Sequence, residues 1–495
     1  MTVSANWNFA GRLAARLGPT AQLVDAATGS TAGPEDLQRL IAGYGAALQS
    51  AGLQRGDRVL IGCTLSVPSA LVYLGTIYAG LVAVPVEERT LSGSATALIK
   101  ATGAKAVWSE AGIALDGSLD GSVLSLWGNL ATDNAAAPPA ECAASDLAVL
   151  MATSGSTGIP RFVKVSHENL TANTEAIIRS QRLGTDERAM VILPLSYCFG
   201  ASLLHTHLYQ GGSVVFDRRF MFPDKVLRSM ADLHCTSFAG VPTAYNVLLG
   251  RSSLMKMEFP RLKRFLQAGG ALAAEKINAI RTVFPDIEFY VMYGQTEATA
   301  RISCLEPGCW AEKQGSVGRP LDNLTVAITD EEGNAVDLGQ VGELRVKGPS
   351  ICSGYWNDAE ETLRVFSDGW LRTGDLARQD AEGYLWIDGR KATFLKIRGT
   401  RVSLAEVEER VAAMPGVFEC GACGVAHPEA GDALLLLVVP DQGAQIDTEG
   451  IRRGLPAHWT LDSIRLVSEL PKTSAGKLAR PALPKWAESG HAAIG

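Results

Sequence analysis

The sequence predicts an α/β protein built from layered sheets, and three observations lead to this prediction. Helical and strand-like segments alternate along the first third of the chain, as a mainly parallel sheet with helical crossovers requires. The 495 residues exceed what one hydrophobic core usually holds. The last hundred residues contain a helix and strands of their own. We therefore expect a large N-terminal domain, residues 1–389, with a small β-barrel-like subdomain, and a small α/β C-terminal lid, residues 390–495.

The first elements follow from local patterns. Residues 68–80 predict a helix, and the apolar run 81–86 predicts a buried strand after it. Residues 131–144 are rich in Ala and Pro and predict a connecting loop before a strand at 147–152. Residues 163–165 should pair back on that strand.

Helix caps and turns mark the elements that follow. Ser166 can cap a helix that carries Leu170, Ile177 and Ile178 on one face. Residues 324–346 alternate strands with Asp, Glu and Gly turns, which indicates the barrel-like subdomain.

The lid begins with a helix after Ser403. The Ser403 hydroxyl can cap this helix while Glu406 reaches back, as in a capping box. Helical spacing places four apolar residues on one face, which we interpret as core: Leu404, Val407, Val411 and Met414. Strands are expected near residues 420–425 and 434–439.

A hydroxyl- and glycine-rich loop between the strands at 147–152 and 163–165 has the composition of a phosphate-binding loop. Glycines let the backbone approach an anion, and hydroxyls and amides donate hydrogen bonds to phosphate oxygens. The residues concerned are Thr153, Ser154, Gly155, Ser156, Thr157, Gly158 and Arg161. A flexible surface loop would have a similar composition. It is not a Walker A loop, because Ile159 and no lysine follows the last glycine.

Four further motifs follow in order along the chain. Tyr293-Gly294-Gln295-Thr296-Glu297 comes after the strand-like run 289–292, and Thr373-Gly374-Asp375 places a carboxylate after a tight turn. Asp388-Gly389-Arg390 ends another strand-like segment, and Lys477 lies in a Gly-Lys pair near the C-terminus. Each motif alone is also what an ordinary loop contains.

Together the five motifs resemble the AMP-forming adenylating superfamily, which contains acyl- and aryl-CoA synthetases, stand-alone adenylation domains and luciferases. The resemblance covers nearly the whole chain. It implies an ATP-dependent acid-thiol ligase: a carboxylate attacks the α-phosphorus of ATP, pyrophosphate leaves, and the acyl-adenylate passes its acyl group to a phosphopantetheine thiol. ATP and Mg²⁺ are the implied cofactors, and CoA or a separate carrier protein is the implied acceptor. It also implies a mobile lid that rotates between the two steps.

The resemblance also implies roles for individual residues. Lys477 would bridge the attacking carboxylate and the α-phosphate, and Arg401 would meet the same phosphate. Thr296 would donate to that phosphate and Glu297 would hold Mg²⁺, a cation that prefers oxygen ligands. Gly399 would line the pantetheine tunnel.

Adenosine would be held by residues from several segments. Asp375 would accept from the ribose hydroxyls, because an ionised carboxylate only accepts hydrogen bonds, and Arg390 would be a second ribose contact. Tyr293 would lie against adenine. The segment that would run beside adenine is Gly269, Gly270 and Ala271.

The acid pocket is expected from residues Tyr197, Phe199, Gly200, Leu204, Gly240, Val241 and Met292. Residues 193–205 contain no carboxylate that could pair with a substrate ammonium, and burying an unpaired ammonium is costly. We therefore expect an aryl or fatty acid that lacks an α-amine. His205 and His207 either touch the substrate or are helix residues satisfied by neighbours.

Three residues depart from the family pattern. Arg161 stands where the family usually has a lysine, and it keeps the charge with a forked geometry. Phe162 replaces a glycine, which leaves open how closely its backbone approaches a triphosphate. Ala392 occupies a hinge position that commonly holds aspartate or lysine, and a small residue can also serve as a hinge.

Composition excludes several other classes. The net charge of −7, without a basic stripe, argues against a nucleic-acid binder. No run of about 18 apolar residues and no signal-like N-terminus occurs, so we expect a cytoplasmic protein without a membrane span. Cys420 and Cys423 have metal-like spacing, but no second Cys or His pair follows them.

Two alternatives remain. The first is a stand-alone amino-acid adenylation enzyme, which the missing pocket carboxylate opposes. The second is a non-catalytic nucleotide-binding scaffold, suggested by Phe162 and Ala392 and opposed by the retained Thr296, Glu297 and Lys477.

Overall fold

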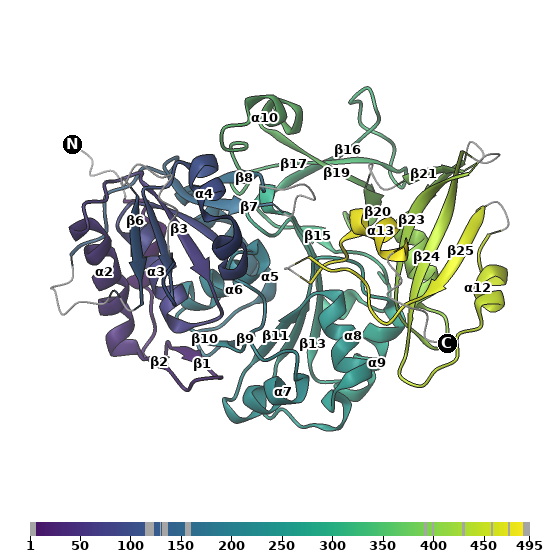
Figure 1. The fold of residues 1–495 in the computed structure, drawn as a ribbon, viewed down its shortest axis with the longest axis horizontal. Coiled ribbons are helices and arrows are strands. Elements are labelled where there is room, and N and C mark those ends of the chain that lie inside the picture. Colours follow the sequence, from purple (N-terminus) through teal and green to yellow (C-terminus); the bar gives the residue numbers. More distant parts are fainter. Residues whose placement is uncertain are drawn as a thin grey trace.

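The computed structural model describes residues 6–113, 123–128, 130, 137–153, 160–390, 394–397, 400–427, 431–456, 459–473 and 476–488. These residues form four sheets: one of six strands, one of nine strands, to which the first two strands of the chain belong, and two of five strands (Figure 1). The predicted α/β class with a large N-terminal part and a small C-terminal part is confirmed.

The six-stranded sheet has the order β6 (Leu124–Trp127), β5 (Ala106–Ser109), β3 (Arg58–Cys63), β4 (Val82–Glu87), β7 (Leu147–Ala152) and β8 (Phe162–Ser166). Its helices are α2 (Pro34–Ser50), α3 (Val67–Tyr78) and α4 (Glu88–Thr102). Only β8 runs antiparallel to its neighbour, with Met151 opposite Val163, as predicted. Thr153 and Arg161, the described residues next to these strands, therefore lie at one end of this sheet.

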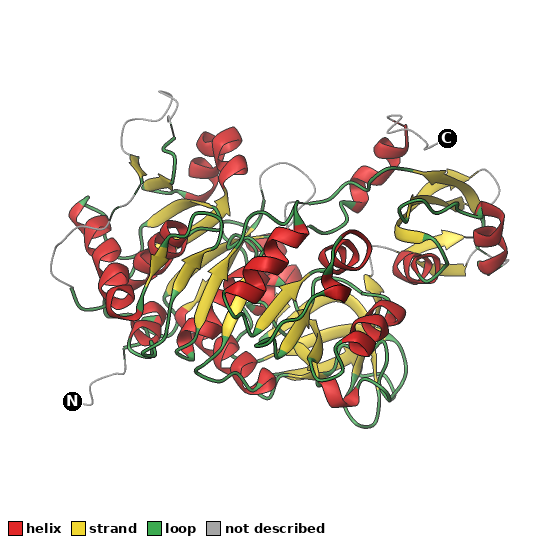
Figure 2. Ribbon diagram, turned by 90° about the horizontal axis from the view of Figure 1, so that it is seen from below, coloured by secondary structure: helices red, strands yellow, loops and turns green. Residues whose placement is uncertain are grey.

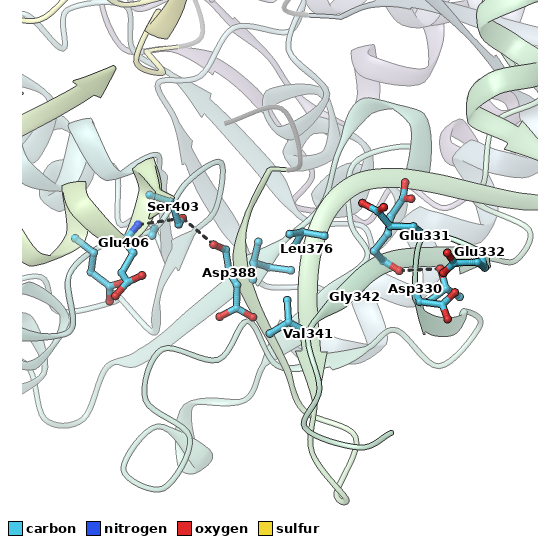
Figure 3. Close-up of a pocket in the computed structure, with 15 residues that line it drawn as sticks. Asp330, Glu331, Glu332, Val341, Gly342, Leu376, Asp388, Ser403 and Glu406 are labelled. Atoms are coloured by element: carbon cyan, nitrogen blue, oxygen red, sulfur yellow. Dashed lines mark hydrogen bonds between the residues drawn. The ribbon is translucent and has the colours of Figure 1, made fainter. Parts of the chain in front are cut away.

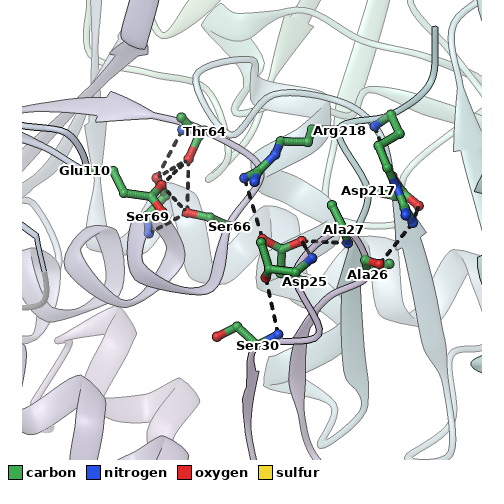
Figure 4. Close-up of polar contacts among 12 residues, drawn as sticks. Asp25, Ala26, Ala27, Ser30, Thr64, Ser66, Ser69, Glu110, Asp217 and Arg218 are labelled. Carbon is green, nitrogen blue, oxygen red and sulfur yellow. Dashed lines mark hydrogen bonds and ion pairs between the residues drawn. The ribbon is translucent and has the colours of Figure 1, made fainter. Parts of the chain in front are cut away.

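Hydroxyl and carboxylate side chains gather beyond β3 and β5 of this sheet. Thr64 and Ser66 both donate to Glu110 Oε2, at 2.7 and 2.9 Å (Figure 4). Ser66 also caps α3 by accepting from the Ser69 amide. These contacts satisfy the polar groups where the two strands end.

The nine-stranded sheet forms the larger half of the N-terminal part. Its order is β15 (Arg319–Pro320), β14 (Ser303–Leu305), β13 (Glu288–Tyr293), β12 (Arg264–Gln267), β11 (Ser237–Gly240), β9 (Arg188–Val191), β10 (Ser213–Phe216), β1 (Leu23–Asp25) and β2 (Thr31–Ala32). The six central strands β13 to β1 are parallel, and β2, β14 and β15 are antiparallel at the edges. The helices that follow or cover these strands are α1 (Phe9–Ala14), α5 (His167–Gln181), α6 (Cys198–Tyr209), α7 (Pro223–Asp232), α8 (Pro242–Arg251) and α9 (Ala274–Val283). Since the central strands are parallel, the loops that leave β9, β11, β12 and β13 meet at one edge, where ligands of such sheets usually bind.

Capping and packing place α5 and α6 against this sheet. Ser166 accepts from the Asn169 amide and Asn169 bonds back to Ser166, so α5 begins with a reciprocal capping box. Every residue of α6 is buried, which explains its nearly continuous apolar sequence.

The predicted barrel-like segment is an antiparallel sheet of β16 (Thr325–Thr329), β17 (Gly342–Lys347), β19 (Trp370–Gln379) and β18 (Phe366–Ser367), with β20 (Leu385–Arg390) paired to β19. Helix α10 (Ala359–Val365) precedes β18. The register of β19 and β20 sets Asp375 directly opposite Arg390.

The C-terminal sheet has the order β22 (Thr400–Ser403), β21 (Phe394–Ile397), β24 (Gly431–Pro440) and β23 (Val417–His427), with β25 (Leu461–Leu466) on β24. Helices α11 (Leu404–Ala412), α12 (Thr448–Gly454) and α13 (Leu483–Glu488) accompany it, and Figure 2 shows these elements as a separate unit at one end of the molecule. Leu404, Val407 and Val411 are buried in its core and Met414 packs against it, as predicted.

The predicted capping box at Ser403 is only half present. Ser403 Oγ accepts from the Glu406 amide at 3.3 Å, but the Glu406 carboxylate accepts from Arg410 Nη2 at 3.0 Å. The reciprocal bond was wrongly predicted, because Arg410 one turn further along the helix offers Glu406 a charged donor.

Candidate active site

Asp375, in β19, lies at the centre of a polar cluster. The other members are Tyr293, at the end of β13, and Arg390, at the end of β20. Its side chain is buried, and Arg390 Nε donates to one carboxylate oxygen at 3.0 Å while the Tyr293 hydroxyl donates to the other at 2.5 Å. The Asp375 charge raises the pKa of Arg390. Three side chains that the sequence motifs singled out therefore meet, although about eighty residues separate Tyr293 from Asp375.

Thr296 and Glu297 lie in the short 3₁₀ turn η2 (Thr296–Ala298) just after β13. The Tyr355 hydroxyl donates to Glu297 Oε1 at 2.8 Å, and the Cys352 amide donates to the Glu297 carbonyl at 3.0 Å. The described residues offer no hydrogen-bond donor to the other carboxylate oxygen of Glu297. An oriented carboxylate with one unused oxygen fits the hard oxygen ligand that Mg²⁺ requires.

Lys477 reaches from the C-terminal domain to Tyr197 of the N-terminal domain. The Thr243 hydroxyl on α8 donates to the carbonyl of the preceding Gly476 at 2.8 Å. The ammonium nitrogen of Lys477 then lies 4.9 Å from the centre of the Tyr197 ring, which is cation-π distance. The two domains thus share one site.

Gly269 allows this close approach. Its φ of +89° is one that glycine adopts readily. A Cβ at this position would lie 2.9 Å from the Tyr197 hydroxyl and 3.4 Å from Lys477 Cε. Any larger residue would therefore push the lysine or the tyrosine out of place.

The charged groups around Lys477 come from two parts of the N-terminal domain. Glu297 follows β13 of the nine-stranded sheet, and Asp375 and Arg390 lie in β19 and β20. Burial lowers the pKa of the Lys477 ammonium, and the charge of Arg390 acts in the same direction. The carboxylates of Asp375 and Glu297 oppose that shift. The Lys477 ammonium therefore lies within electrostatic range of the predicted ribose contacts Asp375 and Arg390 and of the predicted metal ligand Glu297.

Five of the predicted acid-pocket residues share one hydrophobic core cluster: Phe199, Leu204, Val241 and Met292 belong to it, and Tyr197 packs against it. The rings of Tyr197 and Phe199 lie edge to face with centres 6.4 Å apart. Leu204, Val241 and Met292 are buried. Gly200 packs against the carbonyls of Leu193 and Pro194, where a Cβ would come within 2.6 Å of both oxygens. Gly240 ends β11, and a Cβ there would touch Tyr245 at 3.2 Å.

His205 and His207 are satisfied by neighbours. His205 Nε2 is 3.0 Å from the Tyr73 hydroxyl, and His207 is within hydrogen-bond distance of the Leu203 carbonyl and of Ser237. Burial lowers the pKa of His205 to about 3, so the ring is neutral. The interpretation of His205 and His207 as helix residues satisfied by neighbours therefore agrees with these contacts.

Arg161 and Phe162 follow the phosphate-loop motif. Arg161 forms ion pairs with Asp358 at 3.0 Å and Glu361 at 2.9 Å. The Phe162 side chain is 3% exposed and packs in the core with Leu60 and Val84, while its carbonyl accepts from Trp356. The bulk that replaces a glycine is thus absorbed by the core.

Some predicted residues lie outside the described part of the chain: Ser154, Gly155, Ser156, Thr157, Gly158, Ala392 and Gly399. Thr153 is described, and its amide donates to the Arg161 carbonyl at 2.8 Å. Arg401 pairs with Lys396 in the β21–β22 hairpin, and its side chain is outside the description.

A groove of about 700 Å³ separates β16, β17 and β20 from α11 (Figure 3). Seven of its fifteen lining residues are acidic, including Asp330, Glu343, Asp388 and Glu409, and Ala271 also lines it. The neighbouring Gly270 carbonyl accepts from Gln267 Nε2 at 2.7 Å. Gly269 therefore faces Lys477 while Ala271, two residues on, faces the groove.

The described residues contain no cluster of three His, Cys, Asp or Glu that could hold a metal, and Cys420 and Cys423 do not form one. None of the described helices is both long and apolar enough to cross a membrane.

The sequence interpretation missed two side chains. Tyr355 bonds Glu297, and Arg301 lies buried with its guanidinium 4.8 Å from the Phe199 ring centre. Tyr355 carries no sequence signal because it is distant along the chain. Arg301 does carry one: it is a charge among small and apolar residues, four positions after Glu297.

The chain belongs to the AMP-binding enzyme family, which it matches over residues 20–356, and residues 406–477 match the AMP-binding enzyme C-terminal domain. It is 31% identical to a feruloyl-CoA synthase from an Amycolatopsis species, over 90% of this chain and 92% of that protein. It is also 31% identical to a sulfoacetate–CoA ligase from Cupriavidus necator, over 88% and 89% of the two chains.

The solved structures agree. The crystal structure of ATP-bound MatB from Rhodopseudomonas palustris aligns with a TM-score of 0.83 and 27% identity, over 98% of this chain and all of that one. The predicted membership of the AMP-forming adenylating enzymes is therefore confirmed, and with it the class of AMP-forming acid–CoA ligase.

Proposed function

We propose that this enzyme joins an aryl or aliphatic carboxylic acid without an α-amine to CoA, through an acyl-adenylate made at the site around Lys477. The observation that carries the proposal is the position of Lys477, above Tyr197 and beside Gly269, facing Asp375, Arg390 and Glu297.

Nucleotide binding would rest on the cluster around Asp375. A carboxylate already held by Tyr293 and Arg390 keeps a defined orientation, and its remaining lone pairs can accept from ribose hydroxyls. Gly269 and Gly270 would leave room for adenine beside Tyr293. The hydroxyls and amides of residues 153–158, with Arg161, would hold the phosphates.

Glu297 would hold the magnesium ion through its unused carboxylate oxygen. When bound, Mg²⁺ neutralises charge on phosphate oxygens. The Tyr355 hydrogen bond would keep the Glu297 carboxylate oriented, and the neighbouring Thr296 hydroxyl would donate to the α-phosphate.

Lys477 would act in the first step. A carboxylate oxygen of the acid forms a bond to the α-phosphorus while the bond to the bridging oxygen of the β-phosphate breaks, and pyrophosphate leaves. Charge develops on the α-phosphate oxygens, so a cation already in place stabilises the transition state, typically by about 3 kcal/mol for one well-placed group. Arg401 would supply a second cation.

The second step would need Lys477 to leave. The pantetheine arm of CoA would enter along a tunnel lined by Gly399. Its thiolate would form a bond to the acyl carbon, and the bond from that carbon to AMP would break. Since the Lys477 loop belongs to the C-terminal domain, a rotation of residues 390–495 near Gly389 would withdraw it.

The acid class is argued from what the pocket lacks. Tyr197, Phe199, Leu204, Val241 and Met292 present aromatic and aliphatic surface, and residues 193–205 contain no carboxylate for an ammonium. The acids named for the relatives differ widely, from feruloyl to sulfoacetate, so they do not select one class.

We also propose a cytoplasmic location and no nucleic-acid partner. All nine cysteines are free, which supports a reducing compartment. The net charge of −7 opposes binding to a polyanion.

The test is acid-dependent ATP–pyrophosphate exchange with Mg²⁺ and no thiol, across aryl, short-chain, medium-chain, long-chain and amino acids. Exchange with an aryl or aliphatic acid, followed by thioester formation when CoA is added, is expected. Exchange with amino acids alone would contradict the acid class, and ATP binding without any exchange would support a non-catalytic scaffold. Adenylate formation without transfer to CoA would instead indicate a carrier protein as acceptor.

A further inference from the structure

Arg301 is a buried cation that stacks on Phe199, one of the predicted acid-pocket residues. Its exposure is only 2%, and Asn173 holds its backbone at both ends, accepting from the Arg301 amide at 3.3 Å and donating to its carbonyl at 2.9 Å. The two preceding residues, Thr299 and Ala300, have φ of +60° and +115°, which non-glycine residues rarely adopt. The chain is thus constrained to bury this arginine.

The guanidinium has no anionic partner in the part of the chain that the structure describes. Its Nε is buried without a hydrogen-bond partner, and its recorded contact is the face of Phe199, 4.8 Å from the guanidinium carbon. Arg264, which is buried to a similar extent, has Glu187 at 3.2 Å. A buried charge without a counter-ion is costly, so native proteins normally provide one.

The groups that face Arg301 do not balance its charge. They are Cys304, Cys198 and Tyr197, and burial raises the pKa of all three, to about 12 for Cys304. They are therefore neutral near pH 7. Burial also lowers the pKa of Arg301 itself, but an arginine remains charged.

Arg301 and Lys477 stand at opposite ends of one line of contacts. Lys477 Nζ lies over Tyr197, the Tyr197 ring meets Phe199 edge to face, and Phe199 stacks under Arg301. Lys477 would meet the reacting carboxylate. The aromatic pair then forms a wall that leads from the reacting end of the acid to a second cation.

We propose that Arg301 binds a second anionic group, at the end of the acid remote from the reacting carboxylate. The inference rests on the proposed function and narrows it: the preferred acids are aryl or aliphatic acids that carry a distal carboxylate or sulfonate. A guanidinium matches either group with two parallel hydrogen bonds. The bound anion supplies the charge partner that the described chain lacks.

The experiment measures kcat/KM for pyrophosphate exchange with acids matched except at the far end: benzoate, terephthalate and 4-sulfobenzoate, and hexanoate and adipate. At least one acid with a distal anion should exceed its matched monoacid by about 30-fold or more, the scale expected for a buried, hydrogen-bonded charge pair. The terephthalate and 4-sulfobenzoate arms distinguish the two anions.

Arg301→Met should remove this preference by raising the KM for the diacid, and leave the KM for ATP within about twofold. Arg301→Lys should keep part of the preference for acids with a distal anion, because lysine keeps the positive charge. This variant still tests the inference if the methionine variant does not fold. Arg319→Met is the control, because Arg319 also stacks on an aromatic ring, that of Tyr384 at 4.5 Å.

A preference of the wild-type enzyme for the monoacids would overturn the inference and leave the proposed function intact. An equal loss for all acids in both Arg301 variants would assign Arg301 a structural role, and a raised KM for ATP would assign it to the triphosphate. Either result overturns the inference. No exchange with any acid by wild-type enzyme that binds ATP would contradict the proposed function, and the inference with it.

Discussion

Phe162 shows at the scale of one residue how a departure from a motif is accommodated. It follows the phosphate-loop motif, yet its side chain packs in the core beneath the six-stranded sheet. The strand period explains this, because successive side chains of β8 point to opposite faces.

Phe162→Ala should therefore act on stability and leave nucleotide binding unchanged. Truncating a buried phenylalanine typically costs 3–5 kcal/mol, roughly, in the free energy of unfolding. Denaturant unfolding should show this loss, and the KM for ATP, measured where the variant is folded, should stay within about twofold. A large gain in ATP affinity at unchanged stability would mean that the phenylalanine obstructs the phosphate loop.

Asp375 is expected to serve ATP and not the acid. Asp375→Asn removes the charge and one of the two accepting oxygens, because the amide nitrogen that replaces it can only donate. Hydrogen bonds to charged groups contribute about 1.5–3 kcal/mol, so the KM for ATP should rise roughly 10- to 100-fold. Steady-state kinetics should find the KM of the acid unchanged, and a selective effect on the acid would contradict the assignment.

The residues of the site differ in how far sequence alone could predict them. Short contiguous motifs contain Tyr293, Thr296, Glu297, Asp375, Arg390 and Lys477. The structure brings them close together, and their catalytic and binding roles stay predictions. Tyr355 could not be assigned from sequence, because its role depends on a contact across the fold, and the sequence signal of Arg301 does not reveal that Phe199 stacks on it. The Glu406 half of the capping box was wrong, since local pattern does not reveal that Arg410 competes for the same carboxylate.

At the scale of elements, the first turn of α11 joins the two domains. Ser403 Oγ accepts from the Glu406 amide and donates to the Asp388 carbonyl at 2.9 Å. One hydroxyl thus caps a helix of the C-terminal domain and bonds to β20.

Ser403→Ala should lower the free energy of unfolding by about 1–2 kcal/mol, the usual range for a lost helix cap. Glu406→Ala, which removes the side-chain acceptor, should change it by less than about 0.5 kcal/mol, because the Glu406–Arg410 pair is half exposed. If thermal or denaturant unfolding showed that the two variants lose equal free energy of unfolding, the reciprocal Glu406 bond of a complete capping box would be supported.

The strands and helices themselves were predictable where the pattern was long. Residues 68–80, 147–152 and 289–292 correspond to α3, β7 and β13. The pairing order of the nine-stranded sheet was not predictable, because β14 and β15 turn antiparallel at its edge through contacts that periodicity does not encode.

At the scale of the whole molecule, acidic residues of both domains face each other across the groove. Burial raises the pKa of Asp388, and Glu406 adds to that shift, while Arg378 opposes it. A carboxyl group with a raised pKa in the folded protein costs stability when it is ionised. That cost is present at neutral pH and is relieved as the pH falls through the folded-state pKa.

Asp388→Asn should therefore raise the free energy of unfolding at pH 7.5, and the difference should vanish as the pH falls below 4. Asp380→Asn is a control of opposite sign. Burial opposes the shift there, but Lys313 at 2.9 Å holds the Asp380 pKa below its ordinary value. That variant should be destabilised at pH 7.5 and match the wild type in acid. The same pH dependence in both variants would contradict this account of the groove.

The central claim is that Lys477, carried by a mobile domain, serves adenylation and not thioester formation. The most direct measurement compares the two half-reactions of Lys477→Ala by rapid quench. Lys472→Ala is the control, because Lys472 lies in the same segment as Lys477 but forms an ion pair with Glu419. We predict that acyl-adenylate formation falls by at least about 100-fold, while transfer to CoA from supplied acyl-adenylate stays within a few-fold of wild type. An equal loss in both half-reactions, or adenylation at the wild-type rate, would contradict the account.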